Sequence, residues 1–574
     1  MTRFPTFSSE YRERWIQEKL WLDRTLQDYF DETVGHLPGK EAIIFPERPR
    51  SEDETRPYLV PSRIGDDYRI TYLRWRELSD ALAAGLLARG IGFEDIVSVQ
   101  LPNWPEMCLL QIALARIGAV IQPMHIVYRQ REMASMLRFC ESAAVIVPGE
   151  FAGFDFAAAV DEIRGALPDL RLVVTCGSQG RAKLPSIADL IAEGETEINL
   201  LRRHLEKHPV SADQVFYLNF TSGTEGAPKG FLHTHNTLIS TFKRFSDRQA
   251  QYDPHYSEQV VLANSPMTHS YGHLTTYQLI FAGSQVVLVE KFGPKLVLGI
   301  VEREGITALT GTPAHYIALL DHPDFPKTDV SSVRSIGVGG AQCPEKLAAD
   351  LERIFGVRIG NTYGMGENIV HTRTLPTDRP EIVRETVGKV VPGAELKIFS
   401  DDHVQELAVG EIGEIAFRGP SLFLAYFKNP EQTAATLNAE GWFFTGDLGF
   451  VDQQGYLHLA GRKKEMINRG GTKIFPKDIE DLLLLHPKIA QAAVVSMPDY
   501  RLGERVCAYV IPKVAEEAPT LAEIQAFLAG QRVAKNKFPE RIEVISTFPM
   551  TPTGKVRKTE LAEDVRKKLE QETA

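Results

Sequence analysis

The sequence predicts an α/β protein with largely parallel sheets, followed by a small antiparallel barrel and a compact C-terminal segment. Over most of the chain, short apolar runs alternate with stretches in which apolar residues recur every three or four positions. Beyond about residue 385, short alternating runs are punctuated by Gly and Pro, as in antiparallel strands. A basic stretch near residue 462 precedes a further strand and helix pattern, which indicates a second domain.

The N-terminal part supplies the first strand and helix pattern. Apolar spacing predicts helices over residues 16–35, Thr71–Arg89 and Cys108–Ile117. Short runs rich in β-branched residues predict buried strands at Ile96–Leu101, 118–123, Ala143–Val147 and Leu172–Cys176. This alternation favours a largely parallel sheet with helices packed on it.

The same alternation returns beyond residue 220. Strands are expected at Tyr217–Phe220, Gln259–Leu262, Gln285–Val289, Ala308–Thr310 and Ser335–Val338. The barrel strands are expected within 387–399, 410–419 and 455–462. We place the domain boundary so that the first domain covers residues 1–463 and the second covers residues 464–574.

Length and charge limit the possible functions. A chain of 574 residues is too long for one hydrophobic core, so at least two domains are expected. Its formal net charge of −11 argues against a nucleic-acid or anionic-membrane binder, whose surface would be basic. Anionic small ligands stay possible because they respond to the local field only.

The cysteines and the N-terminus indicate a cytoplasmic protein. The five cysteines are scattered without a CxxC pair, which predicts buried, reduced thiols. The N-terminal stretch has no apolar core of a signal peptide. No apolar run approaches the ~18 residues of a membrane span. The oligomeric state is expected to be a monomer or a homodimer.

The loop TSGTEGAPKG, Thr221–Gly230, has the composition of a phosphate-binding loop. Gly223 and Gly226 would allow its backbone N–H groups to point at an anion. Further contacts would come from the hydroxyl groups of Thr221, Ser222 and Thr224 and from the Lys229 ammonium. The spacing differs from GxxxxGK[ST], which argues against a P-loop NTPase. Composition alone would also suit an ordinary surface loop.

Further motifs carry a resemblance to a known family. The pattern TSGTxGxPKG followed by His233–His235 resembles the adenylate-forming superfamily of acyl-CoA synthetases, peptide-synthetase adenylation domains and luciferases. Similar motifs follow in order: GVGGAQCP (Gly337–Pro344), NTYGMGEN (Asn361–Asn368), FFTGDLG (Phe443–Gly449), GRKKEMINRGGTKIFPKDIE (Gly461–Glu480) and PMTPTGKVRK (Pro549–Lys558). The wider pattern is most similar to bacterial ligases for cyclohexanecarboxylate-like and medium-chain acids.

The resemblance implies a fold and a set of nucleotide contacts. The fold would be a large N-terminal domain of two doubly wound α/β subdomains plus the barrel, followed by a small mobile α+β domain. Asp447 and Arg462 would bind the ribose, and Tyr363 would stack on adenine. Glu367 would bind Mg²⁺ together with Thr224. Further ATP or AMP contacts are expected from Gly339, Gly340, Ala341, Asn361, Gly364 and Gly366.

The resemblance also implies the catalytic and mobile parts. Lys555 would hold the carboxylate and the α-phosphate oxygens as charge develops during adenylation. Lys464 would be the hinge about which the small domain rotates, exchanging Lys555 for the Gly470–Gly471 loop, with Gly471 lining the thiol tunnel. His269 would gate the acyl and thiol channels, or would be a structural histidine. The acyl pocket would take residues from 266–273, Thr312 and 337–340.

Three positions depart from the family pattern. Glu225 stands where Thr is usual, and a carboxylate ~6 Å from a phosphate charge costs roughly 3 kcal/mol at an effective dielectric near 20. Gly366 removes a hydroxyl donor to the α-phosphate. In LAYF, Leu424–Phe427, the usual Gly before the Tyr is absent, and no chemical consequence follows from the sequence.

The leading interpretation is an acyl-CoA ligase that uses ATP, Mg²⁺ and coenzyme A on a carboxylic acid. Because an acyl-adenylate has no β- or γ-phosphate, Glu225 suggests a second hypothesis. The protein would then chiefly convert an acyl-adenylate, made by a separate adenylating enzyme, into acyl-CoA. A stand-alone enzyme that loads a carrier protein, a non-catalytic sensor and light emission are further alternatives.

Overall fold

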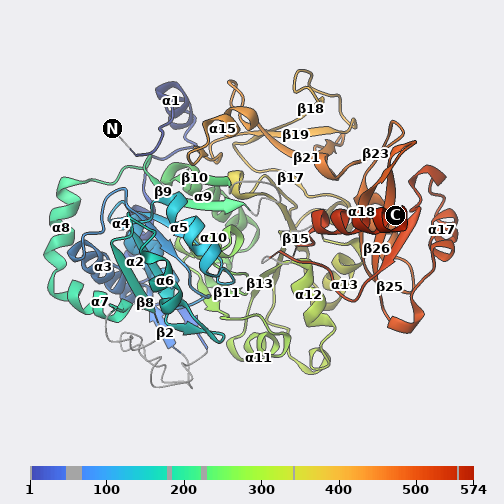
Figure 1. Cartoon of the computed structure of the whole chain (residues 1–574). Helices are drawn as coiled ribbons and strands as arrows, with labels where there is room; N and C mark the ends of the chain where they lie inside the picture. Colours follow the sequence, from blue (N-terminus) through green and yellow to red (C-terminus); the bar gives the residue numbers. More distant parts are fainter. Residues whose placement is uncertain are drawn as a thin grey trace.

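The computed structural model describes residues 3–46, 68–176, 184–221, 229–340, 343–551 and 555–573. Figure 1 shows two large sheets with their helices, a third sheet above them and a C-terminal α+β domain, coloured red, to one side. This arrangement confirms the predicted fold class. Ser222, Gly223, Thr224, Glu225 and Ala341 lie outside the described residues, so their predicted roles stay predictions.

Within the described residues, the first large sheet has seven strands. Their order is β20 (Ala425–Tyr426), β10 (Lys229–Thr234), β9 (Val215–Thr221), β4 (Val120–Pro123), β3 (Ile96–Val99), β5 (Ala144–Pro148) and β8 (Leu172–Cys176). The strands from β9 to β8 are parallel, whereas β10 and β20 are antiparallel. Its helices include α3 (Tyr72–Ala88), α4 (Pro105–Arg116), α5 (Gln130–Cys140), α6 (Phe156–Arg164), α7 (Ile187–Thr196) and α8 (Ile198–Lys207).

The second large sheet has nine strands in the described part of the chain. Their order is β17 (Lys389–Val390), β16 (Thr372–Arg373), β15 (Ile359–Tyr363), β14 (Ser335–Val338), β13 (Ala308–Gly311), β11 (Val260–Ala263), β12 (Gln285–Leu288), β1 (Glu41–Phe45) and β2 (Tyr68–Thr71). The strands from β15 to β1 are parallel, and the others are antiparallel at the edges. The helices following this part are α9 (His235–Tyr252), α10 (Ser270–Ala282), α11 (Pro294–Glu304), α12 (Pro313–Leu320), α13 (Glu345–Phe355) and α14 (Pro380–Glu385).

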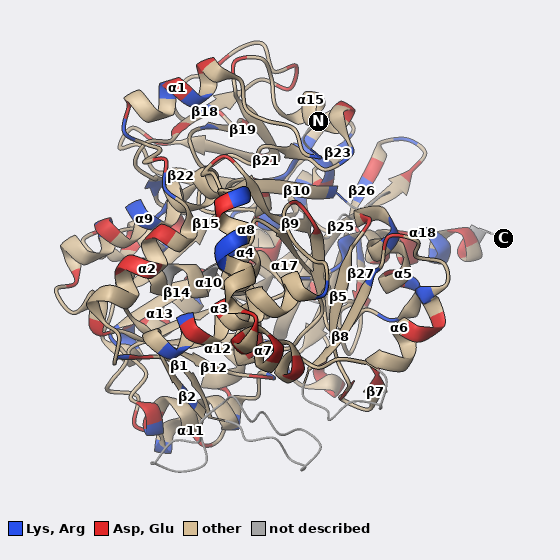
Figure 2. Ribbon diagram, turned by 90° about the vertical axis from the view of Figure 1, so that its left-hand side faces the viewer, with Lys and Arg blue, Asp and Glu red and all other residues tan. Residues whose placement is uncertain are grey.

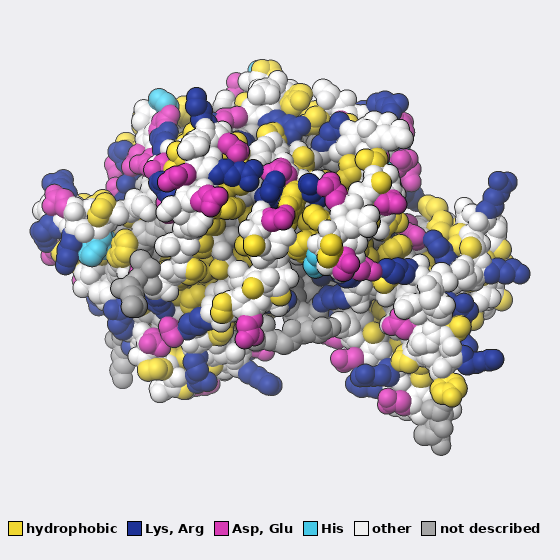
Figure 3. Space-filling view, turned by 90° about the horizontal axis from the view of Figure 1, so that it is seen from above, with side chains coloured by type: hydrophobic (Ala, Val, Ile, Leu, Met, Phe, Trp, Pro, Cys, Tyr) yellow, Lys and Arg dark blue, Asp and Glu magenta, His cyan; other side chains and the backbone are white. Residues whose placement is uncertain are grey.

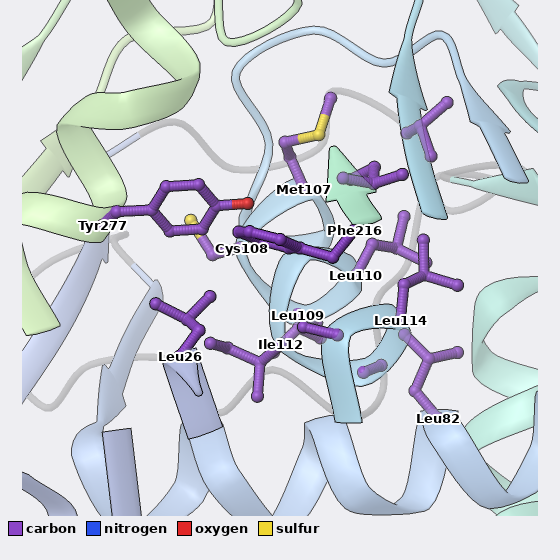
Figure 4. Close-up of a cluster of buried hydrophobic side chains, with 14 of the residues drawn as sticks. Leu26, Leu82, Met107, Cys108, Leu109, Leu110, Ile112, Leu114, Phe216 and Tyr277 are labelled. Atoms are coloured by element: carbon purple, nitrogen blue, oxygen red, sulfur yellow. The ribbon is translucent and has the colours of Figure 1, made fainter. Parts of the chain in front are cut away.

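The main core lies around α4, which is buried from Pro105 to Ala115. A helix that is apolar on all sides is typical of such a position. Figure 4 shows α4 side chains such as Met107 and Leu110 packed among residues of other elements. These neighbours are Leu26 from α2 (Leu26–His36), Leu82 from α3, Phe216 from β9 and Tyr277 from α10. The core therefore joins helices and strands of both large sheets.

The third sheet lies where the sequence predicts a barrel. Its described strands are β18 (Glu395–Phe399), β19 (Gly413–Arg418), β21 (Phe443–Val451) and β22 (Leu457–Arg462), in that order and all antiparallel. The β21 and β22 register pairs Asp447 with Arg462. The end of β22 therefore lies beside the middle of β21.

The C-terminal domain has its own sheet and core. The sheet contains β24 (Thr472–Ile474), β23 (Ile467–Arg469), β26 (Gly503–Pro512), β25 (Ile489–Asp499) and β27 (Arg541–Val544). Its helices are α16 (Pro476–Leu484), α17 (Leu521–Gly530) and α18 (Lys558–Thr573). Apolar clusters that include Ile467 and Val565 are confined to this region. A separate C-terminal unit is confirmed, and the boundary at 463/464 stays a prediction.

One local prediction is wrong. Residues 16–35 do not form one helix, because α1 (Ser9–Gln17) ends at Gln17 and Thr25 starts α2 with a capping box to Asp28. The triplet His233–His235 spans the end of β10 and the start of α9. It begins in β10, and Thr234 is the N-cap of α9.

The surface carries charges of both signs. Figure 2 shows acidic and basic residues interspersed along the ribbon, and Figure 3 shows them mixed with scattered hydrophobic side chains. Among the described helices, none has the length and hydropathy needed to cross a bilayer. All five cysteines are buried and free, as the sequence predicts.

Candidate active site

The predicted phosphate loop joins two paired strands. Thr221 at the end of β9 faces Lys229 at the start of β10 in the antiparallel register. Residues 222–228 therefore connect the two strands of a hairpin. Lys229 lies close enough to Glu367 for its charge to lower the pKa of that carboxyl. The structure thus brings the described end of the loop to the predicted magnesium ligand.

The Asp447 carboxylate is held by two neighbours. Its Oδ2 accepts a hydrogen bond of 2.6 Å from the Tyr363 hydroxyl, and its Oδ1 lies 3.4 Å from Nε of Arg462. Tyr363 is 8% exposed and packs against residues of the third sheet, and its stacking on adenine stays a prediction. The three predicted nucleotide residues therefore form one contiguous group.

Lys555 of the C-terminal domain interacts electrostatically with Asp447 and Arg462. Burial lowers the pKa of its ammonium, and the nearby Arg462 lowers it further, whereas Asp447 raises it. Burial raises the pKa of the Asp447 carboxyl, and Arg462, Tyr363 and Lys555 act in the opposite direction. These mutual effects require the lysine and the carboxylate to be close across the domain boundary. The C-terminal domain thus brings Lys555 near the predicted ribose site.

Glu367 is a buried carboxylate with one tyrosine partner. It lies in η4 (Gly366–Asn368) and is 5% exposed. Its Oε1 accepts a hydrogen bond of 2.7 Å from the Tyr426 hydroxyl on β20. Burial raises the pKa of the Glu367 carboxyl, while the Tyr426 bond and the charges of Lys229 and Arg462 lower it. A bound cation would likewise offset the cost of burying the ionised Glu367 carboxylate.

Sequence reasoning missed Tyr426. It lies in the LAYF stretch, whose departure from the family pattern suggested no chemistry. The structure pairs Ala425 and Tyr426 with β10 and so brings the tyrosine hydroxyl beneath Glu367. No pattern within the stretch identifies this partner, because the contact joins residues 59 positions apart.

Gly366 has a steric explanation. A Cβ at this position would lie 2.3 Å from Cε1 of Phe231 on β10. The Phe231 ring therefore fills the space that a threonine side chain would need. The Gly366 carbonyl accepts a hydrogen bond of 2.8 Å from Nε2 of His233, whose pKa burial lowers to about 4.

The other predicted nucleotide residues line strand ends. A Cβ on Gly364 would lie 2.0 Å from the Ile369 carbonyl oxygen, and one on Gly339 would lie 3.2 Å from the Tyr271 ring. Gly340 adopts a φ of +78°, which favours glycine. The Asn361 amide donates to the Thr386 carbonyl at 3.0 Å, so it holds the neighbouring backbone. Its contact with a nucleotide stays a prediction.

His269 lies beside Lys555 at the start of α10. Its Nδ1 accepts a hydrogen bond of 3.3 Å from the Tyr271 N–H, which makes it the N-cap of the helix. Its ring stacks on that of His125 with centroids 6.3 Å apart, a partner that sequence reasoning missed. Burial, then Lys555, then His125 lower the pKa of His269 to about 3, so the ring is neutral at pH 7.

The hinge residue and the glycine loop follow Arg462 along the chain. Lys464 lies in η5 (Lys463–Glu465), directly after β22. Gly470 and Gly471 form the turn between β23 and β24. The Gly470 N–H donates to the Leu502 carbonyl and the Gly471 N–H to Oδ1 of Asn468, both within the C-terminal domain. The structure thus brings Lys555 to the site and leaves Gly471 on the hairpin.

Comparison with known protein families identifies the family of this chain. A family model described as AMP-binding enzyme matches residues 30–427, and one described as AMP-binding enzyme C-terminal domain matches residues 478–555. The chain belongs to the AMP-binding enzyme family. It is accordingly an adenylate-forming ligase by family, as the motifs predict.

Individual relatives cover nearly the whole chain. The medium-chain fatty-acid–CoA ligase of Escherichia coli (strain K12) is 32% identical, over 99% of this chain and 95% of that protein. The 2,3-dihydroxybenzoate-AMP ligase of Bacillus subtilis (strain 168) is 34% identical, over 87% of this chain and 90% of that protein. The crystal structure of ATP-bound MatB from Rhodopseudomonas palustris is similar with a TM-score of 0.80 and 26% identity, covering 94% of this chain and 99% of that one.

Proposed function

We propose that the protein is an acyl-CoA ligase that acts through an acyl-adenylate. In the first step, a carboxylate oxygen of the acid bonds to the α-phosphorus of ATP and pyrophosphate leaves. In the second, the CoA sulfur bonds to the acyl carbon and AMP leaves. The observation that carries the proposal is the half-buried Lys555 side chain, whose ammonium interacts with the charges of Asp447 and Arg462.

The chain's own groups suit the first step. Asp447 would accept hydrogen bonds from the ribose hydroxyls, since Tyr363 and Arg462 hold its carboxylate in place. Lys555 would place a positive charge where negative charge develops on the α-phosphate and the attacking carboxylate. His269 is neutral at pH 7 and therefore adds no second charge beside Lys555.

Glu367 fits a magnesium site that is completed by the substrate. Among the described residues, no three His, Cys, Asp or Glu side chains gather as a metal cluster. Mg²⁺ is usually held by one or two carboxylates plus substrate phosphates, and the buried Glu367 carboxyl suits that role. Thr224 would add a hydroxyl. The ion would neutralise phosphate charge during transfer.

The thioester step would use the other face of the C-terminal domain. Rotation about Lys464 would withdraw Lys555 and bring the Gly470–Gly471 turn toward the acyl-adenylate. Both glycines have positive φ, +56° and +88°, and a Cβ on Gly471 would meet nothing within 4 Å. A backbone without side chains at this turn suits the lining of a narrow thiol channel.

The test is product analysis with a panel of carboxylic acids. The protein, ATP, Mg²⁺ and CoA are incubated with aliphatic, alicyclic and aromatic acids, and AMP and acyl-CoA are measured by mass spectrometry. Equal amounts of AMP and acyl-CoA with at least one acid support the proposal. A protein that forms neither product with any acid of the panel is not such a ligase.

The sequence also motivates a restricted function, thioester formation from a ready-made acyl-adenylate. Its basis is Glu225, which would oppose the β- and γ-phosphates of ATP and spare the second step. Acyl-CoA formation is compared from acid plus ATP and from synthetic acyl-adenylate. Comparable turnover from both argues against the restriction. Under it, Glu225→Thr should raise the ATP-dependent rate more than the thioester rate.

The similarity to a 2,3-dihydroxybenzoate-AMP ligase supports a second candidate, an adenylating enzyme that passes its acyl group to a carrier protein. The acceptor distinguishes the candidates. The acyl-adenylate is formed in place and then offered either CoA or a phosphopantetheinylated carrier protein. Transfer to CoA at the higher rate favours the ligase, and transfer to the carrier alone favours the second candidate.

A further inference from the structure

A hollow whose wall includes Val370, three residues beyond Glu367, carries three arginines. It lies between α9, β16 and the segments 391–394 and 420–421, and holds about 480 Å³ of empty space, including space open to solvent. Phe245, Val370 and Leu375 supply apolar walls. Arg244 and Arg248 enter it from one face of α9, and Arg373 enters it from β16.

These arginines have no acidic partner in the described parts of the chain. None of the three forms an ion pair there, and no described Asp or Glu lines the hollow. Arg244 donates to the carbonyls of Pro392 and Leu20 at 2.9 and 2.6 Å. The side chains of Arg248 and Arg373 donate no hydrogen bond to a described residue. The hollow therefore carries uncompensated positive charge.

Arg373 has a buried side-chain nitrogen that lacks a partner among the described residues. This nitrogen is Nε, and the guanidinium lies 4.4 Å from the Phe245 ring centroid. Burial lowers its pKa, and the charge of Arg248 adds to this effect. A buried guanidinium is costly unless it is paired. An anion between Arg373 and Arg248 would remove both the burial cost and the repulsion.

The fold makes room for Arg373. A Cβ on Gly360 would lie 2.6 Å from its Nη2, so a larger residue there would displace the guanidinium. Gly360 on β15 is paired with Gly337 on β14. A Cβ on Gly337 would lie 3.7 Å from the Tyr271 hydroxyl. Because paired residues of parallel strands point to the same face, Tyr271 and Arg373 lie on one face of the sheet.

That face is the one the acyl group is expected to cross. The predicted acyl pocket includes residues 266–273 and 337–340, and Tyr271 contacts the second of these segments. Neighbouring strands are about 4.8 Å apart, so the Arg373 guanidinium over Gly360 lies about one strand beyond the Tyr271 hydroxyl over Gly337. An acyl chain that passes Tyr271 would thus bring its far end to the arginines.

We propose that Arg244, Arg248 and Arg373 bind a second anionic group of the acid substrate, at the far end of an apolar chain. The assignment rests on the proposed adenylating function and names its substrate class. Apolar walls with guanidinium groups at one end match a dicarboxylic acid better than a simple fatty acid, whose methyl end would leave the arginines unpaired.

The test compares acids of equal length. The kcat/KM for pyrophosphate release is measured with dicarboxylic acids of six to ten carbons and with the matching monocarboxylic acids. We expect at least one dicarboxylic acid to be preferred about tenfold, the value of a hydrogen bond to a charged group. In Arg248→Gln this preference should fall about tenfold. Arg248 is suitable because its side chain donates no hydrogen bond to a described residue.

A matched control comes from the same helix. Lys243→Gln removes one positive charge from α9, but Lys243 pairs with Asp247 at 2.5 Å and does not line the hollow. It should leave the preference unchanged. A wild-type preference for monocarboxylic acids, or a preference that Arg248→Gln leaves intact, overturns the proposal while the adenylating function stands.

If no acid is adenylated, calorimetry tests the arginine pocket separately from the proposed adenylating function. Wild-type protein and Arg248→Gln are titrated with the dicarboxylic acids and with inorganic phosphate. Dicarboxylic acid binding that is lost in the variant supports the pocket even when the proposed function fails. Binding of phosphate without binding of any dicarboxylic acid overturns the substrate assignment, because the pocket then serves a free anion. The absence of both kinds of binding overturns it as well.

Discussion

Tyr426 binds the Glu367 carboxylate with its hydroxyl, although it stands in a stretch whose sequence suggested no chemistry. His125, two residues beyond the end of β4, likewise stacks on the His269 ring. Both contacts depend on tertiary packing that local patterns do not encode. The residues found by motif, Asp447, Arg462 and Lys555, could be predicted because their spacing within the motifs is itself the signal.

Gly366 should not accept the threonine that the family pattern has. In Gly366→Thr, the Phe231 ring must move, and such overpacking costs typically 1–3 kcal/mol. We expect a lower urea midpoint for unfolding. The double variant with Phe231→Leu should recover part of the loss, because the smaller side chain frees the space. A single variant as stable as the wild type would contradict the steric explanation.

Adenylation should decline at alkaline pH because the Lys555 ammonium loses its proton there. Its pKa is lowered from 10.5 by burial and then by Arg462, so the ammonium loses its proton at a lower pH than a solvent-exposed lysine. Adenylation should therefore decline as the pH rises through this lowered pKa. In Lys555→Arg, whose guanidinium keeps its proton, the residual activity should not show that decline. Acid-dependent exchange of pyrophosphate into ATP measures both profiles, and an identical alkaline decline in the two proteins would assign it to another group.

At the scale of elements, strands and helices of the parallel sheets follow the predicted runs within a few residues. Short strands that form by pairing alone could not be predicted. β16 has two residues, Thr372–Arg373, and exists because β15 and β17 flank it. β10 could not be predicted either, because its residues belong to the end of the TSGTEGAPKG loop and to the His233–His235 triplet. It forms by pairing with β9, which precedes the loop. β16 and β10 nevertheless carry Arg373 and Lys229.

The start of α9 should control the helix that carries Arg244 and Arg248. The Thr234 side chain accepts a hydrogen bond from the Thr237 N–H, and Thr237 returns one to the Thr234 N–H. Loss of such a cap costs about 1 kcal/mol, so Thr234→Ala should destabilise the first turn of α9. Amide hydrogen exchange should become faster at the start of α9. Unchanged exchange there would mean that packing alone holds the helix, and α13 serves as the internal control.

In the whole molecule, the buried Glu414 carboxylate connects Lys463, just after β22, with the backbone next to Asp447 on β21. Glu414 is 4% exposed and accepts hydrogen bonds from Lys463, His403 and the Gly446 N–H. Burial alone would raise the pKa of Glu414, but the bonds from Lys463 and His403 outweigh it and hold the pKa below its usual range. Lys463 directly precedes the predicted hinge residue, so this contact couples the domain junction to the part of β21 that directly precedes Asp447.

Lys463→Gln should weaken this junction. A hydrogen bond to a charged group contributes about 2 kcal/mol, so the urea midpoint should fall at pH 7. A lowered pKa contributes stability above the ordinary value of 4.5 that is lost as the pH falls through the folded value. The difference between wild type and variant should therefore shrink below pH 4.5. A difference that is independent of pH would point to a cause other than Glu414.

The central claim is that Lys555, Asp447 and Arg462 form an adenylating site across the two domains, and one comparison tests it most directly. Wild-type protein and Lys555→Met are each given acid plus ATP, and separately preformed acyl-adenylate plus CoA. We predict that the variant loses acyl-CoA formation from acid and ATP by at least about a hundredfold, within the range reported for removing one preorganised charge-stabilising group. It should keep formation from the acyl-adenylate. Equal losses in both reactions, or no loss in the first, would contradict the account.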